Sequence, residues 1–198
     1  TIKKLPPISW IIISLIILTI IGSFIFKKAP KYFSDKKIEQ AAANYSTGKD
    51  LASQGKYQEA TSYLQKAVNS DSDNSSYIKE LAVAKYNTKD YQAAIDMYNE
   101  LIKINDKDAF AYNGIANCYR DWAKVTADKQ KEYQNNAVTN YNNAINANKN
   151  YTISYNNLAL LYQDMGDKKQ AISILQDGVK ANPDSQELKN SLKIMQGK

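Results

Sequence analysis

The sequence predicts an all-α protein in which a two-helix unit is used four times, followed by a capping helix and preceded by one membrane-spanning helix. Three observations carry this prediction. Small residues recur at a fixed spacing, apolar residues lie three and four apart between them, and an uncharged apolar run stands near the N-terminus. Fixed self-similarity over tens of residues is typical of stacked repeats.

The small residues recur every 34 positions, with a single step of 43 in each series. The three series are Ala60, Ala94, Ala137 and Ala171; Gly48, Ala82, Ala116 and Ala159; and Ala67, Leu101, Ala144 and Gly178. The longer step places nine extra residues between Ala116 and Ala137. Small side chains let two helix backbones approach closely. A larger side chain at Ala94 would overpack the contact and destabilise the fold by about 1–3 kcal/mol. A helical bundle with small residues along its seam is the alternative, but it does not require three series in one register.

Local signals predict helix, turn, helix within each unit. Gly55 and Gly166 suit the positive φ that ends a helix. Leu158, Leu161 and Tyr162 show the spacing of one buried helical face. Pro183 cannot continue a helix and therefore ends the array.

These signals divide the chain into five parts. The array is expected over residues 41–185, with repeats at 41–74, 75–108, 109–151 and 152–185. Residues 186–198 are predicted to form an amphipathic capping helix, because a terminal repeat needs a cover with a polar outer face. Residues 1–31 are predicted to be an anchor that spans the membrane over about 8–26, and residues 32–40 a linker.

The anchor is predicted from Ile8 to Phe26, which contains no charge. Nineteen residues at about 1.5 Å each reach close to the thickness of the hydrocarbon core, roughly 30 Å. A cleaved secretory signal is the alternative, but its apolar region is usually shorter and ends in small residues. An uncleaved single span is therefore the interpretation, at the cell membrane.

The basic charge of the chain lies around this run. Residues 1–37 hold seven lysines and one acidic residue, which accounts for the net charge of +6. The remaining residues are neutral, so the basic face expected of a nucleic-acid-binding protein is missing. The lysines after Phe26 outnumber those before Ile8, which favours cytoplasmic repeats by a small margin over exported ones.

Five motifs stand at the repeat turns and starts: Gly55-Lys56-Tyr57-Gln58-Glu59-Ala60, Asp90-Tyr91-Gln92-Ala93-Ala94-Ile95, Met165-Gly166-Asp167-Lys168-Lys169-Gln170-Ala171-Ile172, Ala111-Tyr112-Asn113-Gly114-Ile115-Ala116 and Ser154-Tyr155-Asn156-Asn157-Leu158-Ala159. In these motifs the chain resembles the tetratricopeptide repeat (TPR) family. The resemblance covers about residues 41–185 and implies a right-handed α-solenoid that binds a protein or peptide in a concave groove lined by the first helices. It departs where the third repeat is interrupted and where most repeat-end prolines are absent.

Side chains that face outward from the seam of the first helices are the candidate groove residues. They are Lys79, Tyr86, Asn113, Asn117, Arg120, Asn156 and Asn157. A carboxamide donates and accepts at once, so the asparagines suit a peptide backbone. Simple solvation of an Asn-rich surface is the alternative interpretation.

Some members of the family grip a C-terminal carboxylate, and the resemblance places Asn117 and Asn157 at the two asparagine positions of that clamp. The lysine position holds Asn113, and the following helix offers Glu187 and Ser191 where basic residues are needed. The clamp is incomplete, so this specificity is not expected here. The insertion, between Trp122 and Asn136, is interpreted either as part of the binding side or as a surface extension.

The composition argues against catalysis. The chain has no histidine and one cysteine, and it lacks a phosphate-binding glycine motif. Cys118 lies at helical spacing with Ile115 and Tyr119, as a small core residue does. We therefore expect no enzyme activity, cofactor, metal or small-molecule substrate.

Two functions remain. The first is a membrane-anchored adaptor that recruits a protein or peptide through the groove. The second is a structural protein that self-assembles at the membrane by stacking its repeats. The polar outer face predicted for the last helix opposes stacking and favours the adaptor.

Overall fold

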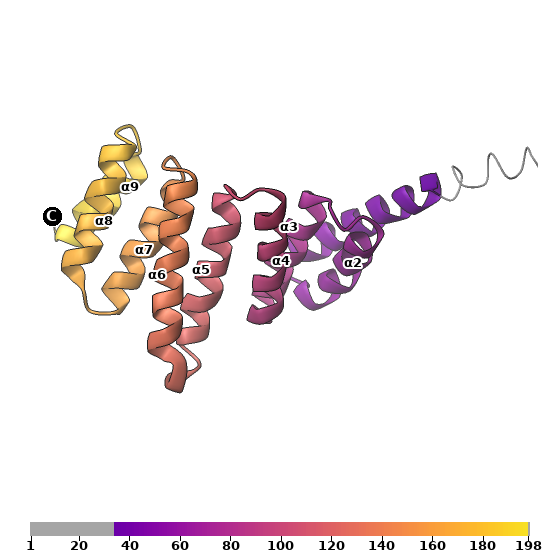
Figure 1. Ribbon diagram of the computed structural model, residues 1–198, viewed down its shortest axis with the longest axis horizontal. Coiled ribbons are helices and arrows are strands. Elements are labelled where there is room, and N and C mark those ends of the chain that lie inside the picture. Colours follow the sequence, from indigo (N-terminus) through magenta and orange to yellow (C-terminus); the bar gives the residue numbers. More distant parts are fainter. Residues whose placement is uncertain (1–33, 198) are drawn as a thin grey trace, which may run out of the picture.

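The computed structural model describes residues 34–197, which form a row of antiparallel helices (Figure 1). Residues 34–53 are helical, and their first part projects beyond the end of the row. The elements that follow are α2 (Tyr57–Ser70), α3 (Ser75–Asn87), α4 (Tyr91–Ile104), α5 (Ala109–Ala123), the 3₁₀ turn η1 (Ala127–Lys129), α6 (Gln130–Ala147), α7 (Thr152–Asp164), α8 (Lys168–Ala181) and α9 (Gln186–Gln196). Each helix packs mainly on the next one along the chain, as in a stacked repeat.

The predicted small-residue seam is confirmed. Every member of the three series is buried, and Ala60, Ala94, Ala137 and Ala171 have no exposed surface. Large side chains from the facing helix fill the space that the small residues leave. Leu64 packs over Gly48 so closely that a Cβ built on the glycine would lie 2.6 Å from Leu64 Cγ. The seam therefore sets the distance between the two helices of a repeat.

Three of the four turns within repeats share the same backbone conformation and the same closing hydrogen bond. Gly55, Lys89 and Gly166 all have φ between 63° and 83°, and the residue after each donates its N–H to a carbonyl oxygen five positions earlier at 2.8–3.0 Å. This is the left-handed helix end that glycine favours. Lys89 adopts the same conformation with a side chain, so the turn geometry here is imposed by the repeat and not by local preference.

The insertion extends the two helices of the third repeat. α5 has 15 residues, α6 has 18, and η1 forms the turn between them. The extended part is held by aromatic packing: Trp122 lies 4.7 Å from Tyr133, and Tyr91 of the preceding repeat lies 6.1 Å from Trp122 (ring centroids). The contact between α5 and α6 is the most extensive helix pair in the described structure.

The last helix covers the end of the array. Ser185 caps α9 by accepting the Leu188 N–H, and Gly197 ends it with φ 76°. Leu188 and Met195 are buried against the fourth repeat, while Lys189, Asn190 and Lys193 are exposed. α9 thus presents a mainly polar outer face, with Ile194 as its exposed apolar exception.

The predicted membrane location is corrected. The anchor at residues 1–31, its span at 8–26 and residues 32–33 of the predicted linker lie outside the described residues, whereas residues 34–40 of that linker are part of the helix that runs to residue 53. Of the helices in residues 34–197, none is both long enough and apolar enough to cross a bilayer. On that finding the location at the cell membrane, on either side, is wrong as a prediction, and membrane contact has no part in the proposals below.

Gly114 provides a test of the seam, with Gly178 as its matched control. A Cβ at Gly114 would overlap the ring of Tyr98, which is 3% exposed and closed in by the core. A Cβ at Gly178 would lie 3.0 Å from Tyr155 Cγ, so Tyr155 would have to move by only a few tenths of an ångström. Both substitutions gain about 1 kcal/mol of helix propensity. We therefore expect Gly114→Ala to lower the free energy of unfolding by about 1–3 kcal/mol and Gly178→Ala to leave it nearly unchanged.

Urea denaturation followed by circular dichroism measures both variants. Equal midpoints for the two would contradict the close approach at Gly114.

Candidate functional site

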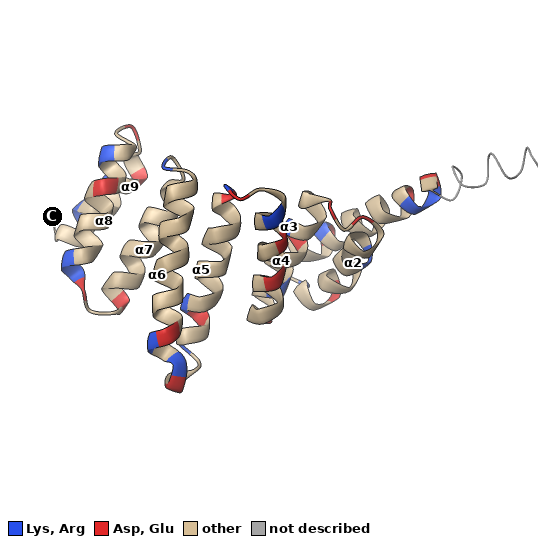
Figure 2. Ribbon diagram, viewed as in Figure 1, with Lys and Arg blue, Asp and Glu red and all other residues tan. Residues whose placement is uncertain are grey.

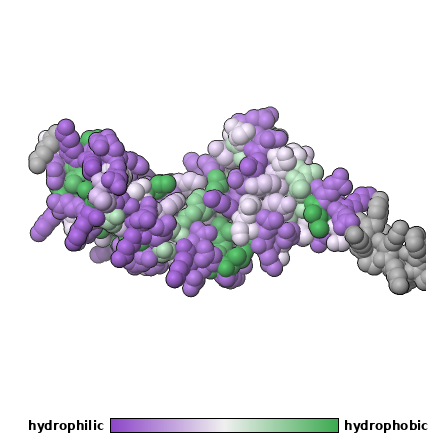
Figure 3. Space-filling view, turned by 90° about the horizontal axis from the view of Figure 1, so that it is seen from above, coloured by the Kyte–Doolittle hydropathy of each residue, from purple (hydrophilic) through white to green (hydrophobic). Residues whose placement is uncertain are grey.

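The first helices line the hollow side of the array. α3 contacts α5 and α7 contacts α9, whereas the second helices of neighbouring repeats make no contact of that extent within residues 34–197. Helices on the inner side of a curved row approach one another and those on the outer side spread apart. The space-filling view of the row from above shows a hollow along its upper edge and a bowed lower edge (Figure 3). The hollow side is the groove, and all seven predicted groove residues lie on α3, α5 and α7.

Asn113 is the buried member of this set. Its side chain is 6% exposed, and its Oδ1 accepts hydrogen bonds from Ser154 Oγ and Asn157 Nδ2, both at 3.1 Å. Ser154 is fully buried. The expectation that Asn113 lies on the open surface is therefore replaced: Asn113 joins α5 to α7 from within the interface.

Asn117, one turn further along α5, continues the connection. Its Oδ1 accepts from Asn157 Nδ2 at 3.4 Å and from the Tyr141 hydroxyl at 2.6 Å. Tyr141 has no exposed surface and comes from α6, a second helix. Its hydroxyl oxygen accepts in turn from Arg120 Nη1 at 3.4 Å. Thus one polar chain links the second helix of the third repeat to the groove surface.

Asp121 ends this chain on the side of the second repeat. Arg120 donates to both carboxylate oxygens, at 3.0 and 3.2 Å, and Lys124 Nζ lies 3.3 Å from Oδ1. The Tyr86 hydroxyl of α3 donates to Oδ2. Burial by itself would raise the pKa of Asp121, but the bonds from Arg120 and Tyr86 outweigh it and hold the pKa below its usual value. Burial and the bond to Asp121 raise the pKa of Tyr86, so it remains a neutral donor.

We call these eight residues the seam network; it joins neighbouring repeats and is distinct from the small-residue seam inside each repeat. It consists of Tyr86, Asn113, Asn117, Arg120, Asp121, Tyr141, Ser154 and Asn157. A buried polar group without a partner costs about 1–3 kcal/mol, so a satisfied network favours one relative placement of the repeats over others. The network spans the second, third and fourth repeats. It connects α3, α5, α6 and α7 by hydrogen bonds.

Lys79 and Asn156 lie outside the network. Lys79 is exposed on α3, and its Nζ lies 4.0 Å from the centre of the Phe110 ring of α5, a cation–π contact. Asn156 Nδ2 donates to Glu187 Oε1 of α9 at 2.7 Å. The other atom of this carboxamide, Oδ1, is buried and has no hydrogen-bond partner within residues 34–197.

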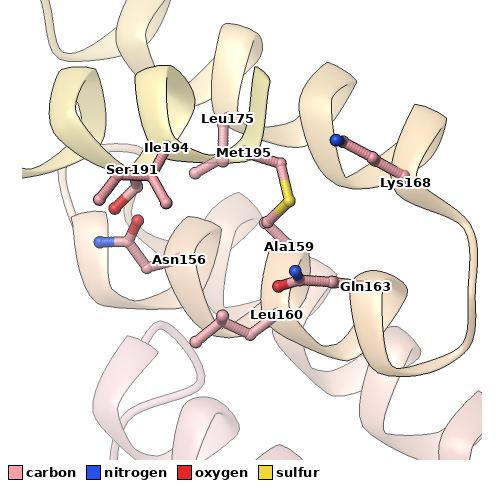
Figure 4. Close-up of a pocket in the computed structure, with 9 residues that line it drawn as sticks. All are labelled: Asn156, Ala159, Leu160, Gln163, Lys168, Leu175, Ser191, Ile194 and Met195. Carbon is pink, nitrogen blue, oxygen red and sulfur yellow. The ribbon is translucent and has the colours of Figure 1, made fainter. Parts of the chain in front are cut away.

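A pocket opens between α7 and α9, next to Asn156 (Figure 4). It encloses about 250 Å³ and is lined by Asn156, Ala159, Leu160, Gln163, Lys168, Leu175, Ser191, Ile194 and Met195. Leu160 and Ile194 are 49% and 77% exposed, although both are apolar. We call this cavity the α7–α9 pocket.

The structure joins five of the seven predicted residues in one network and sets Lys79 and Asn156 apart at its two ends. The sequence did not single out Asp121, Tyr141 or Ser154 as partners of these residues. Tyr141 and Ser154 occupy core positions at helical spacing, which is also what simple packing predicts. The charge of Asp121 beside Arg120 was the available signal, since a carboxylate at a buried face requires a partner.

Cys118 is a core residue, as the sequence predicted. It has no exposed surface, and burial first, then the charge of Asp121, raises the pKa of its thiol to about 12. Within residues 34–197 no group of His, Cys, Asp and Glu side chains is arranged to hold a metal ion. Residues 34–197 carry equal numbers of positive and negative side chains, spread over the helices and turns (Figure 2).

Comparison with protein families gives two matches. A family model described as tetratricopeptide repeat matches residues 51–118, and a second model with the same description matches residues 153–185. No curated protein matches the chain by sequence.

Several solved structures share the fold. TTC0263, a thermophilic TPR protein of Thermus thermophilus, is 16% identical with a TM-score of 0.64 over 78% of this chain and 80% of that chain. MamA 41-end from Desulfovibrio magneticus RS-1 is 16% identical with a TM-score of 0.60 over 80% and 84%. The first TPR of Spaghetti (RPAP3), bound to the HSP90 peptide SRMEEVD, is 20% identical with a TM-score of 0.54 over 65% and 95%. At these identities the likeness concerns the fold alone.

The seam network predicts a pH dependence of stability. Because Asp121 has a lowered pKa in the folded state, its contribution is present above the ordinary carboxyl pKa of about 3.9 and is lost as the pH falls through the folded value. We expect Asp121→Asn to lower the free energy of unfolding by about 1–3 kcal/mol at neutral pH. The difference in free energy of unfolding between Asp121→Asn and the unsubstituted chain should become smaller as the pH falls below about 4.

Urea denaturation across this pH range measures this difference, with Asp184→Asn in the exposed turn before α9 as the control. A difference in free energy of unfolding that stays constant from neutral to acidic pH would show that the Asp121 charge does not stabilise the network.

Cys118 provides a second test, because the thiolate is the form that reacts with disulfide reagents. A pKa raised from 9.0 to about 12 lowers the thiolate population near neutral pH by roughly a factor of 1000. We expect slow reaction of the folded chain with Ellman's reagent and fast reaction in denaturing urea. Fast reaction of the folded chain would contradict the burial of this side chain.

Proposed function

Because the chain belongs to the tetratricopeptide repeat family, we propose that it is an adaptor that holds a protein or peptide partner in the groove of its first helices. The observation that carries the proposal is the orientation of the groove asparagines. The side-chain oxygens of Asn113 and Asn117 both face the seam network, where each accepts two hydrogen bonds. The seam network therefore determines which atom of each amide is left for a partner.

The atoms that are left are hydrogen-bond donors. The amide nitrogens of Asn113 and Asn117 donate to no acceptor within residues 34–197, and Asn117 is the less buried of the two residues. An extended peptide carries a carbonyl oxygen at every residue, and these oxygens accept from such donors whatever the side chains are. A groove that offers amide N–H groups therefore suits a peptide backbone.

The remaining predicted groove residues have different roles in this proposal. Lys79 on α3 adds a further hydrogen-bond donor to those of the α5 asparagines, and its contact with Phe110 restricts the conformations of its side chain. Arg120 and Tyr86 act indirectly, because Asp121 already occupies them. Asn157 holds the two α5 asparagines in place, and Asn156 lies at the far end beside the α7–α9 pocket.

No catalytic role is part of the proposal. The only thiol is buried, and the carboxylate best placed for chemistry, Asp121, is neutralised by Arg120 and Lys124. Self-assembly by stacking is disfavoured by the exposed Lys189, Asn190 and Lys193 on the outer face of α9. The proposal instead assigns the groove a surface of amide donors that a peptide backbone can use.

Photo-crosslinking in the native cell tests the adaptor role. A photoreactive amino acid is placed at Lys79 on α3 or at Asn99 on α4, a second helix; both sites are exposed. We expect a partner adduct from position 79 and none from position 99, with the partner identified by mass spectrometry. Adducts from position 99 alone, or adducts that contain only a second copy of this chain, would contradict the groove assignment.

A further inference from the structure

We infer that the α7–α9 pocket is the anchor point of the groove and takes an aliphatic side chain of an extended peptide, with an acidic residue next to it. This inference rests on the proposed function and specifies the chemistry of the partner at one end of the groove. Three features of the pocket support it: its apolar surface, one unpaired acceptor, and one unpaired cation.

The pocket has an apolar floor and an apolar rim. Ala159, Leu175 and Met195 are 1%, 1% and 8% exposed and form the floor. Leu160 from α7 and Ile194 from α9 form the rim on opposite sides (Figure 4). Burying an apolar side chain is favourable, so two such residues left in solvent around one cavity favour an apolar occupant.

The volume of the pocket selects the size of that occupant. Drug-sized ligands bind in cavities of about 300–1,000 Å³, whereas this one encloses about 250 Å³. One or two peptide side chains are the matching ligand. Met195 has an unbranched side chain, which adapts to differently shaped aliphatic groups.

Asn156 determines how the peptide backbone enters. Because its Nδ2 is held by Glu187 at 2.7 Å, its Oδ1 is the atom that lacks a partner within residues 34–197. A buried acceptor without a donor destabilises the structure around it. A backbone N–H of a bound peptide at this end of the pocket would supply the donor and remove that destabilisation.

Lys168 determines the charge of the flanking residue. It is the only charged residue of the pocket lining, and its ammonium group is directed toward the pocket from the start of α8 (Figure 4). Within residues 34–197 it forms no ion pair. A carboxylate beside the anchored side chain would pair with Lys168, whereas a cation would be repelled.

A second cavity does not have these features. It lies at the ends of α5 and α7 and contains Arg120, Lys124 and Asp164. Arg120 and Lys124 already pair with Asp121. Its cationic groups are therefore satisfied within the chain, and it offers no comparable apolar floor.

The three methionines of the chain allow a direct test of the pocket. With ¹³C-methyl methionine, Met195 reports on the pocket floor, while Met97 on α4 is a distant internal control. The probes are three blocked peptides, Gly-Ser-Leu-Asp-Ser-Gly, Gly-Ser-Leu-Lys-Ser-Gly and Gly-Ser-Ala-Asp-Ser-Gly. We expect the Leu-Asp peptide to shift the Met195 resonance of the full chain saturably. The other two should require at least about tenfold higher concentration.

Two variants on α7 separate the pocket from the rest of the helix. Leu160→Ser removes one side of the rim, and Ile153→Ser is its matched control, because Ile153 is 46% exposed and lies outside the pocket. We expect Leu160→Ser to weaken the Leu-Asp response about tenfold and Ile153→Ser to preserve it. An equal response in Leu160→Ser, or an equal response to the Ala-Asp peptide, would overturn the inference. So would a Met195 resonance that changes only on dilution of the chain, which would identify a second copy as the occupant.

Crosslinking from position 79 in the Leu160→Ser background distinguishes this inference from the proposed function. If Leu160→Ser gives the same partner adducts as the unsubstituted chain, and the Leu-Asp peptide does not shift Met195 in the unsubstituted chain, the adaptor role stays in place and the pocket is not its anchor. A peptide response at Met195 without any partner adduct would support the pocket and overturn the adaptor role.

Discussion

The close approach of two helices at small residues is the constraint on which the rest of the molecule depends. Ala60, Ala94, Ala137 and Ala171 are fully buried, and large side chains such as Leu64 and Tyr98 occupy the space that small residues leave. Since protein interiors are close-packed, a seam of this kind permits little variation in helix separation. Each repeat therefore has one shape, and the row of first helices has one curvature. The groove is a consequence of that curvature.

A second, polar interaction decides how neighbouring repeats sit against each other. Apolar contacts between repeats are non-directional and tolerate sliding, but hydrogen bonds between Asn113, Ser154 and Asn157 require a single register. The same bonds orient the asparagine amides toward the groove. The fold and the proposed function thus rest on the same side chains.

The nine inserted residues are absorbed without disturbing this register. They lengthen α5 and α6 away from the seam, and Trp122, Tyr133 and Tyr91 fasten the extension to the preceding repeat. Arg120 and Asp121, at the start of the extension, belong to the seam network. The insertion is therefore coupled to the groove through α5, although its own turn lies beyond it.

The sequence by itself determined the repeat, its period, the place of the insertion, the capping helix and the helix that carries each candidate residue. These follow from local rules, because small residues, apolar spacing and turn glycines act on neighbours in the chain. The tertiary structure alone decided which polar side chains are paired. Asn113 and Ser154 are 41 residues apart, and Tyr86 and Asp121 are 35 apart. The α7–α9 pocket likewise combines three helices. Contacts of that separation depend on the angle between repeats, which arises from the packing of all side chains together and leaves no periodic mark in the sequence.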